Sequence, residues 1–280
     1  MSMSGAAKLA GVLGWPVAHS KSPALHGHWI NRHGIDGAYV PLAVPPERFD
    51  RAIDGLIDLG FVGCNVTIPH KEAAAQRCTK VSENARRVGA VNTIIIEPDG
   101  TLTGDNTDGF GFLESLKHGA PDWRADQGPA VVLGAGGASR AVISALLGAG
   151  CQDLRLTNRT RERAEDLASH FGESVTVLDW DERSACLADA GLLVNTTSLG
   201  MTGQPPLDLS LDLLPTDAVV TDNVYSPLET PLLAAAVQRG NSVVDGMGML
   251  LHQARPGFAA WFGVEPVVDE FLRAAVLASR

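Results

Sequence analysis

The chain has 280 residues, of which 45% are hydrophobic and 19% charged, and its formal net charge is -10. Its length exceeds the usual size of a single core, so we expect two domains, and its ordinary composition argues against disorder. The negative charge disfavours non-specific binding to nucleic acid or to an anionic membrane. We therefore expect neither as a partner, and we expect a few placed cations to bind any anionic ligand.

The N-terminal residues do not form a signal-peptide pattern, and no segment approaches about 18 uninterrupted apolar residues. A cytoplasmic location is therefore expected. The four cysteines, Cys64, Cys78, Cys151 and Cys186, are scattered, without a CxxC pair or a cluster with histidine. This spacing predicts reduced, mostly buried thiols and no metal site.

Short β-rich runs alternate with helix-like stretches through the first hundred residues. The strand-like runs are 8–14, 37–44 and 61–69, and the helix-like runs between them are 22–34 and 46–60. This alternation predicts a βαβαβ arrangement with a parallel sheet.

A second alternating set begins at Pro129 and predicts another parallel sheet, of the Rossmann-like, doubly wound kind. Its strand-like runs are 130–133, 153–157, 191–198, 217–225 and 241–246, with helix-like runs at 140–150 and 161–171. Residues 118–129 have the composition of a surface connection, and 249–278 carry two helical patterns. We therefore predict an α/β protein with a substrate domain at 1–108, a dinucleotide-binding domain at 109–250 and C-terminal helices at 251–280 that pack back on the first domain.

A glycine-rich segment, Gly134-Ala135-Gly136-Gly137-Ala138-Ser139, lies between the strand-like run 130–133 and the helix-like run that follows. Gly134 permits a tight turn, Gly136 lets a pyrophosphate approach the backbone, and the helix start offers free N–H groups. Ser139 stands where the dinucleotide fingerprint usually has Gly or Ala. By itself, the segment leaves open a glycine-rich turn that is needed only for packing.

The next strand-like run ends in Asn158-Arg159-Thr160, where an NAD enzyme would present a carboxylate about 20 residues after the glycines. Arg159 is suited to bind the 2′-phosphate of NADP, and Arg163, one helical turn further, to add a second cation. On residue type alone, a solvated helix start also explains both arginines.

Polar residues also follow the strands of the first half. Ser20 and Ser22 stand between a strand and a helix start, where two hydroxyls and free N–H groups suit a carboxylate, although a serine-rich helix cap explains them nearly as well. The segment 65–71 follows another strand, at the edge where open parallel sheets bind ligands. Segments 89–93 and 106–109 add amide and carboxylate groups in turns.

Together these segments resemble the shikimate dehydrogenase family. The family motifs occur in order from Gly14 to Gln253: His-Ser-x-Ser-Pro, NVTxPxK, GAVNT, NTDxxG, GAGGA followed by NRT, and GMGMLxxQ. The resemblance covers nearly the whole chain. It implies an enzyme of the shikimate pathway that reduces 3-dehydroshikimate to shikimate with NADPH, with the substrate in the cleft between two domains.

Matched motif by motif, the resemblance also implies roles for individual residues. Lys71 and Asp108 would be the catalytic pair. The substrate would contact Ser20, Ser22, Thr67, Lys71, Asn92, Asp108, Tyr225 and Gln253. NADP would contact Gly134, Ala135, Gly136, Gly137, Ala138, Ser139, Asn158, Arg159, Thr160, Arg163, Val224, Gly246 and Met249. One departure is His26-Gly27, where the family often has His-Asn; we expect its effect to be local to the first helix.

Ketone reduction needs a hydride, a proton and stabilisation of the charge that develops on oxygen. A lysine ammonium supported by a carboxylate can supply the last two, which fits Lys71 with Asp108, although residue type alone favours a solvated helix start for the lysine and a turn for the aspartate. Two alternatives stay open: a quinate/shikimate dehydrogenase, and a catalytically dead sensor of a metabolite or dinucleotide. The sequence leaves open the oligomeric state, including a homodimer, and the strictness against quinate and NAD.

Overall fold

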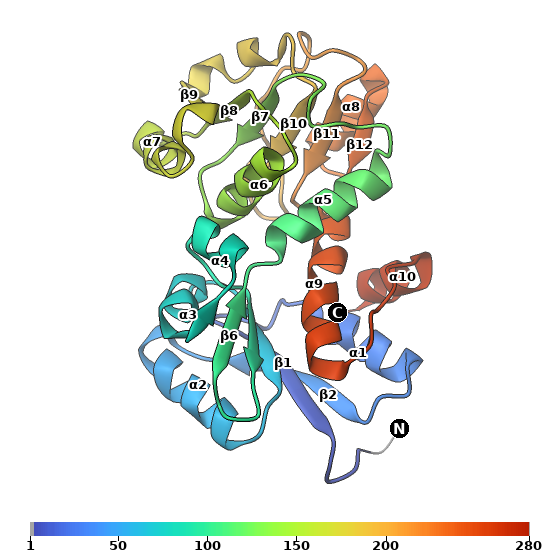
Figure 1. Ribbon diagram of the computed structural model, residues 1–280. Coiled ribbons are helices and arrows are strands. Elements are labelled where there is room, and N and C mark those ends of the chain that lie inside the picture. Colours follow the sequence, from blue (N-terminus) through green and yellow to red (C-terminus); the bar gives the residue numbers. More distant parts are fainter. Residues whose placement is uncertain (1–2, 280) are drawn as a thin grey trace. The chain divides into compact units, whose positions relative to one another are not determined.

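The computed structural model describes residues 3–279, which form two compact units (Figure 1). Unit 1 comprises Met1–Thr107 with Gln253–Arg280, and unit 2 comprises Asp108–His252. The chain thus leaves unit 1 directly before Asp108 and returns to it at Gln253. Among the described residues, none of the helices combines the length and apolar character that crossing a membrane requires.

Unit 1 is built on a six-stranded sheet with the order β2-β1-β3-β5-β6-β4. Its strands are β1 (Lys8–Gly14), β2 (Gly37–Ala43), β3 (Gly63–Val66), β4 (Lys80–Val81), β5 (Thr93–Ile96) and β6 (Leu102–Asp105). Strands β1, β2 and β3 are parallel, which confirms the predicted arrangement, whereas β5 runs antiparallel to both β3 and β6. This hairpin was not predicted, although Pro98-Asp99-Gly100 between two short β-rich runs is a turn signal.

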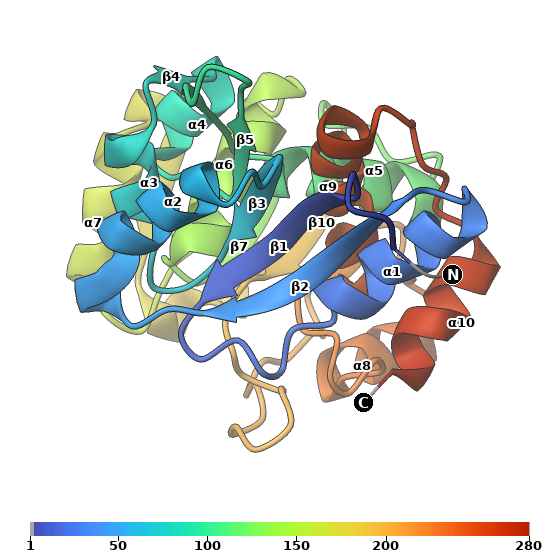
Figure 2. The ribbon, with the colours of Figure 1, turned by 90° about the horizontal axis from the view of Figure 1, so that it is seen from below.

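Helices cover both faces of the unit 1 sheet (Figure 2). They are α1 (Ser22–Arg32), α2 (Phe49–Asp58), α3 (Lys71–Arg77), α4 (Glu83–Val88), the second half of α9 (Gly246–Phe262) and a 3-10 turn at Pro46–Arg48, while α10 (Glu270–Ala278) packs against α1. On one face, Phe49, Ile53 and Leu56 recur at helical spacing along α2 and pack with Leu13 and Val66 of the strands.

The other face of this sheet carries a group of rings that we call the aromatic cluster. It consists of His26, Trp29, Tyr39, Phe258 and Trp261. The two indole N–H groups donate to the backbone carbonyls of Val267 and Ile94 at 3.0 Å. The cluster therefore holds α1, α9 and the segment before α10 against the strands.

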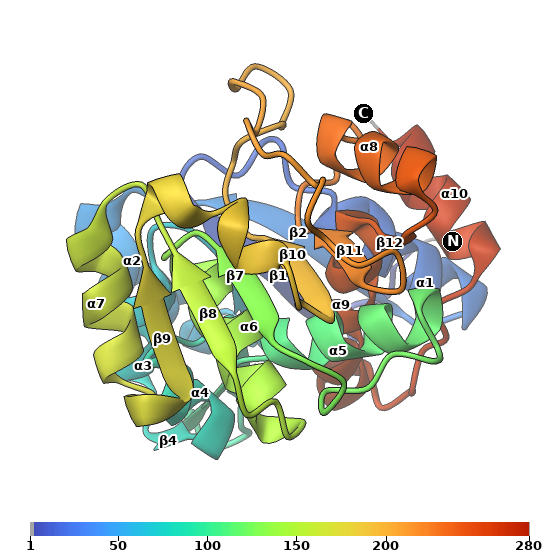
Figure 3. The same cartoon turned by 90° about the horizontal axis from the view of Figure 1, so that it is seen from above.

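Unit 2 is a parallel six-stranded sheet with the order β12-β11-β10-β7-β8-β9, and its strands lie side by side in Figure 3. The strands are β7 (Ala130–Leu133), β8 (Leu154–Thr157), β9 (Val175–Leu178), β10 (Leu192–Asn195), β11 (Val219–Asp222) and β12 (Ser242–Val244). This is the Rossmann order, which confirms the predicted fold, and β9 is the one strand of this sheet that the sequence did not predict. The order reverses between β7 and β10, where such sheets bind ligands.

Both faces of the unit 2 sheet are buried, because successive residues of one strand enter different cores. Val131 and Leu133 of β7 pack in one core, and Ala130 and Val132 pack in the other. The covering helices are α5 (Asp108–Gly119), α6 (Gly137–Gly148), α7 (Arg161–Ser169), α8 (Pro231–Arg239) and the start of α9, with 3-10 turns at Gly172–Ser174, Trp180–Glu182 and Ala185–Leu187. Near-continuous apolar strands such as 130–133 are typical of such two-sided burial.

Candidate active site

The loop after β1 brings the two predicted carboxylate-binding serines to the start of α1. The Ser22 backbone N–H donates to Ser20 Oγ at 3.3 Å, and the Ser20 N–H donates to the Val17 carbonyl at 3.0 Å. Ser22 is buried and Ser20 is half-buried. Ser20 thus accepts a hydrogen bond from the first N–H of α1, as expected for a serine-rich helix cap. Both serines also lie at a helix N-terminus, which favours binding of an anion.

The segment after β3 carries Thr67 and Lys71. The Thr67 N–H donates to the Leu13 carbonyl at 2.9 Å, and Lys71 opens α3 with its carbonyl accepting from Val91 at 2.9 Å. His70, between them, is buried, with Nε2 2.8 Å from the Val44 carbonyl. His70 is therefore a core residue that anchors the segment, and both Thr67 and Lys71 are half-buried.

A buried hydrogen-bond network surrounds Asn92. Its Oδ1 accepts from the Thr107 backbone N–H at 2.9 Å and from Thr93 Oγ1 at 3.0 Å. Its Nδ2 donates to Thr107 Oγ1 at 3.1 Å and to Gln253 Oε1 at 3.4 Å, and Thr107 Oγ1 donates to the Gln253 carbonyl at 2.8 Å. Because a backbone N–H can only donate, the bond from Thr107 fixes the orientation of the Asn92 amide.

Sequence reasoning did not assign Asn65, which joins this network from β3. Its Oδ1 accepts from the Tyr39 hydroxyl at 2.6 Å, and its Nδ2 donates to the Asn92 carbonyl at 3.2 Å and to Thr93 Oγ1 at 3.1 Å. A buried amide in the otherwise apolar strand GCNV was the available signal, because such a group needs partners.

The strand register places these groups in one row. Leu13 of β1 is opposite Val66 of β3, Asn65 is opposite Thr93 of β5, and Thr93 is opposite Asp105 of β6. The serine loop, the Thr67–Lys71 segment, Asn92 and Thr107 therefore all lie at one edge of the unit 1 sheet.

Asp108 is the first residue of α5 and of unit 2, and it directly follows Thr107. Its side chain is buried. A carboxylate in the first turn of a helix is stabilised by the free N–H groups there. The chain thus passes directly from the Asn92 network to a buried carboxylate.

The glycine-rich turn connects β7 to α6 in unit 2. Gly134 has φ +106°, and a Cβ there would come within 2.8 Å of Thr196 Oγ1. Ser139, the departure from the fingerprint, is buried, with its hydroxyl accepting from the Gly136 N–H at 3.0 Å and lying 2.6 Å from Thr196 Oγ1. Ser139 closes the turn, while at Gly136 and Gly137 an added Cβ would meet no atom within 4 Å, which leaves an open approach for a ligand.

Arg159 and Arg163 follow β8, whose last residue, Thr157, accepts from the Gly134 N–H at 2.8 Å. Both side chains are exposed, and among residues 3–279 neither has an ion-pair partner. Arg161, between them, is paired with Glu165 and Asp179. Two unpaired guanidinium groups beside an open glycine-rich turn fit a dinucleotide with a 2′-phosphate.

The loop that carries Val224 and Tyr225 is ordered by Asp222, which sequence reasoning did not single out. The Asp222 carboxylate accepts from Asn195 Nδ2 at 2.9 Å, from the Val224 N–H at 3.0 Å and from Thr230 Oγ1 at 2.7 Å. Burial raises the pKa of Asp222, and the hydrogen bonds from these three groups offset only part of that shift. Burial also raises the pKa of the Tyr225 phenol.

The remaining predicted cofactor residues lie in or beside the same part of unit 2. Asn158 donates from Nδ2 to the Thr160 carbonyl at 2.8 Å and so shapes the turn after β8. At Gly246 a Cβ would come within 2.4 Å of the Asn223 carbonyl, so only glycine fits. Met249 is partly buried against the core that also contacts Ala135.

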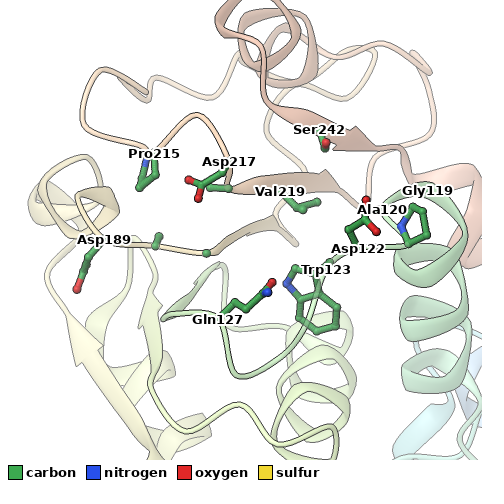
Figure 4. A pocket seen from close by; sticks show the side chains of 14 residues that line it. Gly119, Ala120, Asp122, Trp123, Gln127, Asp189, Pro215, Asp217, Val219 and Ser242 are labelled. Carbon is green, nitrogen blue, oxygen red and sulfur yellow. The ribbon is translucent and has the colours of Figure 1, made fainter.

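A cavity of about 770 Å³ in unit 2 lies away from all these residues (Figure 4). Gly191, Val219 and Ser242 in its wall stand at the amino ends of β10, β11 and β12, opposite the edge that carries the glycine-rich turn. Asp122 and Asp217 also line it, and they would repel an anionic dinucleotide. We therefore do not identify this cavity with the cofactor site.

The four cysteines carry free thiols, three of them buried and Cys186 half-buried, which confirms the prediction of mostly buried thiols. Burial raises the pKa of Cys64 to about 12 and that of Cys78 to about 11. Neither thiol is therefore a nucleophile near neutral pH. Among the described residues, no group of three or more His, Cys, Asp or Glu side chains could hold a metal ion.

Comparison with known sequences gives matches along the whole chain. Residues 12–94 match the family described as shikimate dehydrogenase substrate binding domain, and residues 119–201 match the family described as shikimate/quinate 5-dehydrogenase. The shikimate dehydrogenase (NADP(+)) of Rhodospirillum rubrum is 62% identical over 279 residues, covering 98% of this chain and 99% of the relative. That of Paramagnetospirillum magneticum is 59% identical over 276 residues, covering 99% and 100%.

Solved structures are similar over the same length. Shikimate 5-dehydrogenase from Thermus thermophilus in complex with NADP(H) and shikimate has a TM-score of 0.85 at 38% identity, with 96% of this chain and 98% of that chain covered. Quinate dehydrogenase from Corynebacterium glutamicum in complex with NAD has a TM-score of 0.91 at 33% identity, with 98% and 99% covered. The solved structures that resemble this chain therefore include both a shikimate dehydrogenase and a quinate dehydrogenase.

Proposed function

The chain belongs to the shikimate dehydrogenase family, and we propose that it catalyses the reversible reduction of 3-dehydroshikimate to shikimate by NADPH. The observation that carries this proposal is the row of polar groups at one edge of the unit 1 sheet, where Asn65, Thr93 and Asp105 of neighbouring strands stand in register. A hydroxylated ring with one carboxylate needs such a set of hydroxyl, amide and cationic groups.

Most of the proposed substrate contacts come from the polar edge of the unit 1 sheet. Ser20 and Ser22, at the start of α1, bind its carboxylate by hydrogen bonds that are strengthened by the charge. Thr67, Asn92 and Gln253 bind the ring hydroxyls or the carbonyl, and the fixed amide of Asn92 offers donors in one orientation. Tyr225, on the loop held by Asp222, is assigned a further substrate contact.

Lys71 and Asp108 are the proposed catalytic residues. Lys71 donates a proton to the carbonyl oxygen during reduction and stabilises the negative charge that develops there. Asp108 supplies the counter-charge for that ammonium and accepts a hydrogen bond from a ring hydroxyl. In the reverse direction, Lys71 takes the proton of the reacting hydroxyl.

NADP is assigned to unit 2, where the nicotinamide supplies the hydride when bound. The N–H groups and the open backbone of residues 134–139 bind the pyrophosphate, and residues 158–160 with Arg163 bind the adenosine and its 2′-phosphate. Val224, Gly246 and Met249 border the nicotinamide. The two unpaired guanidiniums favour NADP over NAD, because NAD offers them only a hydroxyl.

The test is a set of initial rates with shikimate and with quinate, each against NADP and against NAD. We expect the highest kcat/KM for shikimate with NADP. A higher kcat/KM for quinate or for NAD would favour the quinate-type alternative. No turnover with any combination, together with measurable binding of NADP by calorimetry, would favour a dinucleotide sensor.

We further propose a cytoplasmic enzyme, because four free and mostly buried thiols are typical of a reducing compartment. We also propose that it forms a homodimer. Light scattering of the purified chain measures its mass directly, and a single species of 29.4 kDa would contradict the dimer.

A further inference from the structure

Tyr39, in β2, is bonded to the hydrogen-bond network around Asn92 in the proposed substrate site. Its buried hydroxyl donates to Asn65 Oδ1 at 2.6 Å. Burial raises the pKa of this phenol well above its usual range, so the hydroxyl keeps its proton and can donate it. Through Asn65, the phenol is joined to the Asn92 network.

The direction of the protons around Tyr39 is fixed. Asn65 Nδ2 is committed as a donor to the Asn92 carbonyl at 3.2 Å and to Thr93 Oγ1 at 3.1 Å, so Asn65 Oδ1 must face Tyr39. A phenol has a single proton, and here that proton goes to Asn65. The Tyr39 hydroxyl therefore has no proton left to donate to any other group.

The ring of Tyr39 is clamped from behind by His26. The two rings stack with centroids 4.0 Å apart and an angle of 7°, and Trp29, Phe258 and Trp261 surround the imidazole. Both His26 nitrogens are buried without a hydrogen-bond partner, and burial lowers the pKa of His26 to about 3, although nearby Asn65 raises it slightly. His26 is thus a neutral, flat ring at working pH, and the unpaired nitrogens indicate that it is held for its shape.

We propose that Tyr39, clamped by His26, is a positioning residue for the substrate. Through Asn65 and Thr93 it supports the amide of Asn92, whose Oδ1 accepts from Thr93 Oγ1 as well as from the Thr107 N–H. Such preorganisation lowers the entropy cost of binding, because the side chains are already held in their binding positions before the substrate arrives. This role rests on the proposed function of Asn92.

The first test is Tyr39→Phe, which keeps the stacked ring and removes only the hydroxyl. We expect KM for shikimate to rise roughly three- to tenfold, the equivalent of one lost neutral hydrogen bond, with kcat within about twofold and KM for NADP unchanged. A merely structural hydroxyl would lower the melting temperature and leave KM for shikimate as it was, and that result would overturn the proposal.

The matched control is His26→Phe, which keeps an aromatic ring behind Tyr39 and removes nitrogens that bond nothing. KM for shikimate should stay within about twofold of wild type, because a neutral stacked ring is retained. If His26→Phe raises KM as much as Tyr39→Phe does, the effect comes from disturbed packing and not from the hydroxyl, and the proposal fails.

A double-mutant cycle with Asn92→Ala tests whether Tyr39 acts through Asn92. In the Asn92→Ala background, Tyr39→Phe should change the calorimetric Kd for shikimate by a clearly smaller factor than in wild type. Equal factors in both backgrounds would contradict the coupling. The wild-type rate with shikimate and NADP is measured alongside, so that loss of the proposed function is distinguished from loss of the positioning role, and the binding cycle reports on Tyr39 in either case.

Discussion

Unit 1 and unit 2 hold their proposed ligand-binding groups in opposite ways. In unit 1 the polar groups bind one another: Asn92 is fixed by Thr107 at 2.9 Å, and Asn65 by Tyr39 at 2.6 Å. In unit 2, Arg159 and Arg163 extend exposed and unpaired beside an open glycine turn. The difference indicates that the substrate is selected by the geometry of neutral hydrogen bonds and the cofactor by charge.

Replacing Lys71 is expected to have the largest effect, because it removes the one cation assigned to chemistry among the neutral groups of unit 1. Lys71→Ala should lower kcat by roughly 10² to 10⁴, the usual contribution of a positioned acid or base, and leave the affinity for NADP unchanged. Steady-state rates and a calorimetric titration with NADP measure both. The control is Lys80→Ala, an exposed lysine of the same unit. Near-normal turnover of Lys71→Ala would remove this residue from the mechanism.

Arg159→Ala tests the charge-based half of the comparison. Loss of a hydrogen bond to a charged group, about 1.5 to 3 kcal/mol, should lower kcat/KM for NADP by roughly ten- to a hundredfold and change that for NAD far less. Arg163→Ala should act in the same direction but more weakly. Arg161→Ala is the matched control, since this exposed arginine is already paired with Glu165 and Asp179. A ratio of kcat/KM for NADP over NAD that stays constant in Arg159→Ala would rule out the phosphate clamp.

The double variant Ser20→Ala with Ser22→Ala tests the hydrogen-bonding half. KM for shikimate should rise roughly tenfold or more, because each hydroxyl is assigned a bond to the carboxylate, while KM for NADP stays constant. Normal binding of shikimate by the double variant would show that the two serines cap the helix and do not bind the carboxylate. The melting temperature of the same variant measures that capping contribution separately.

Gly134 and Gly136 belong to the same turn, but we expect glycine to be needed for folding at position 134 and for cofactor binding at position 136. Gly134→Ala places a side chain at φ +106° and 2.8 Å from Thr196 Oγ1, so it should destabilise the fold by about 1 to 3 kcal/mol. Gly136→Ala meets no atom within 4 Å, so the melting temperature should hold while KM for NADP rises, because the methyl group occupies the approach of the pyrophosphate. A normal KM for NADP in Gly136→Ala would place the cofactor elsewhere.

Features that depend on residues close together in the sequence could be predicted, whereas hydrogen bonds between residues distant in the sequence could not. The strand–glycine–helix turn at 130–139 and the parallel order of β1, β2 and β3 follow from local patterns, and the structure confirms both elements. The networks were not predicted, because their partners are distant in sequence: Tyr39 meets Asn65 across 26 residues, and Asn195 meets Asp222 across 27. The bond from the Val224 N–H to the Asp222 carboxylate is local, but the bonds from Asn195 and Thr230 that complete the support of this loop come from more distant residues.

The smallest expected effect concerns Gly27, where the family often has asparagine. Gly27 lies inside α1, and a Cβ there would meet no atom within 4 Å. Gly27→Ala should therefore stabilise unit 1 by about 0.5 to 1 kcal/mol, since glycine costs helix propensity and nothing in the packing requires it. Gly248→Ala in α9 is the contrast, because its Cβ would come within 2.1 Å of Ser115 Oγ and should destabilise unit 2. Chemical denaturation measures both changes. A lower stability or a changed KM for shikimate in Gly27→Ala would show that position 27 affects the serine loop that precedes it. The effect of the departure from asparagine would then not be confined to helix α1.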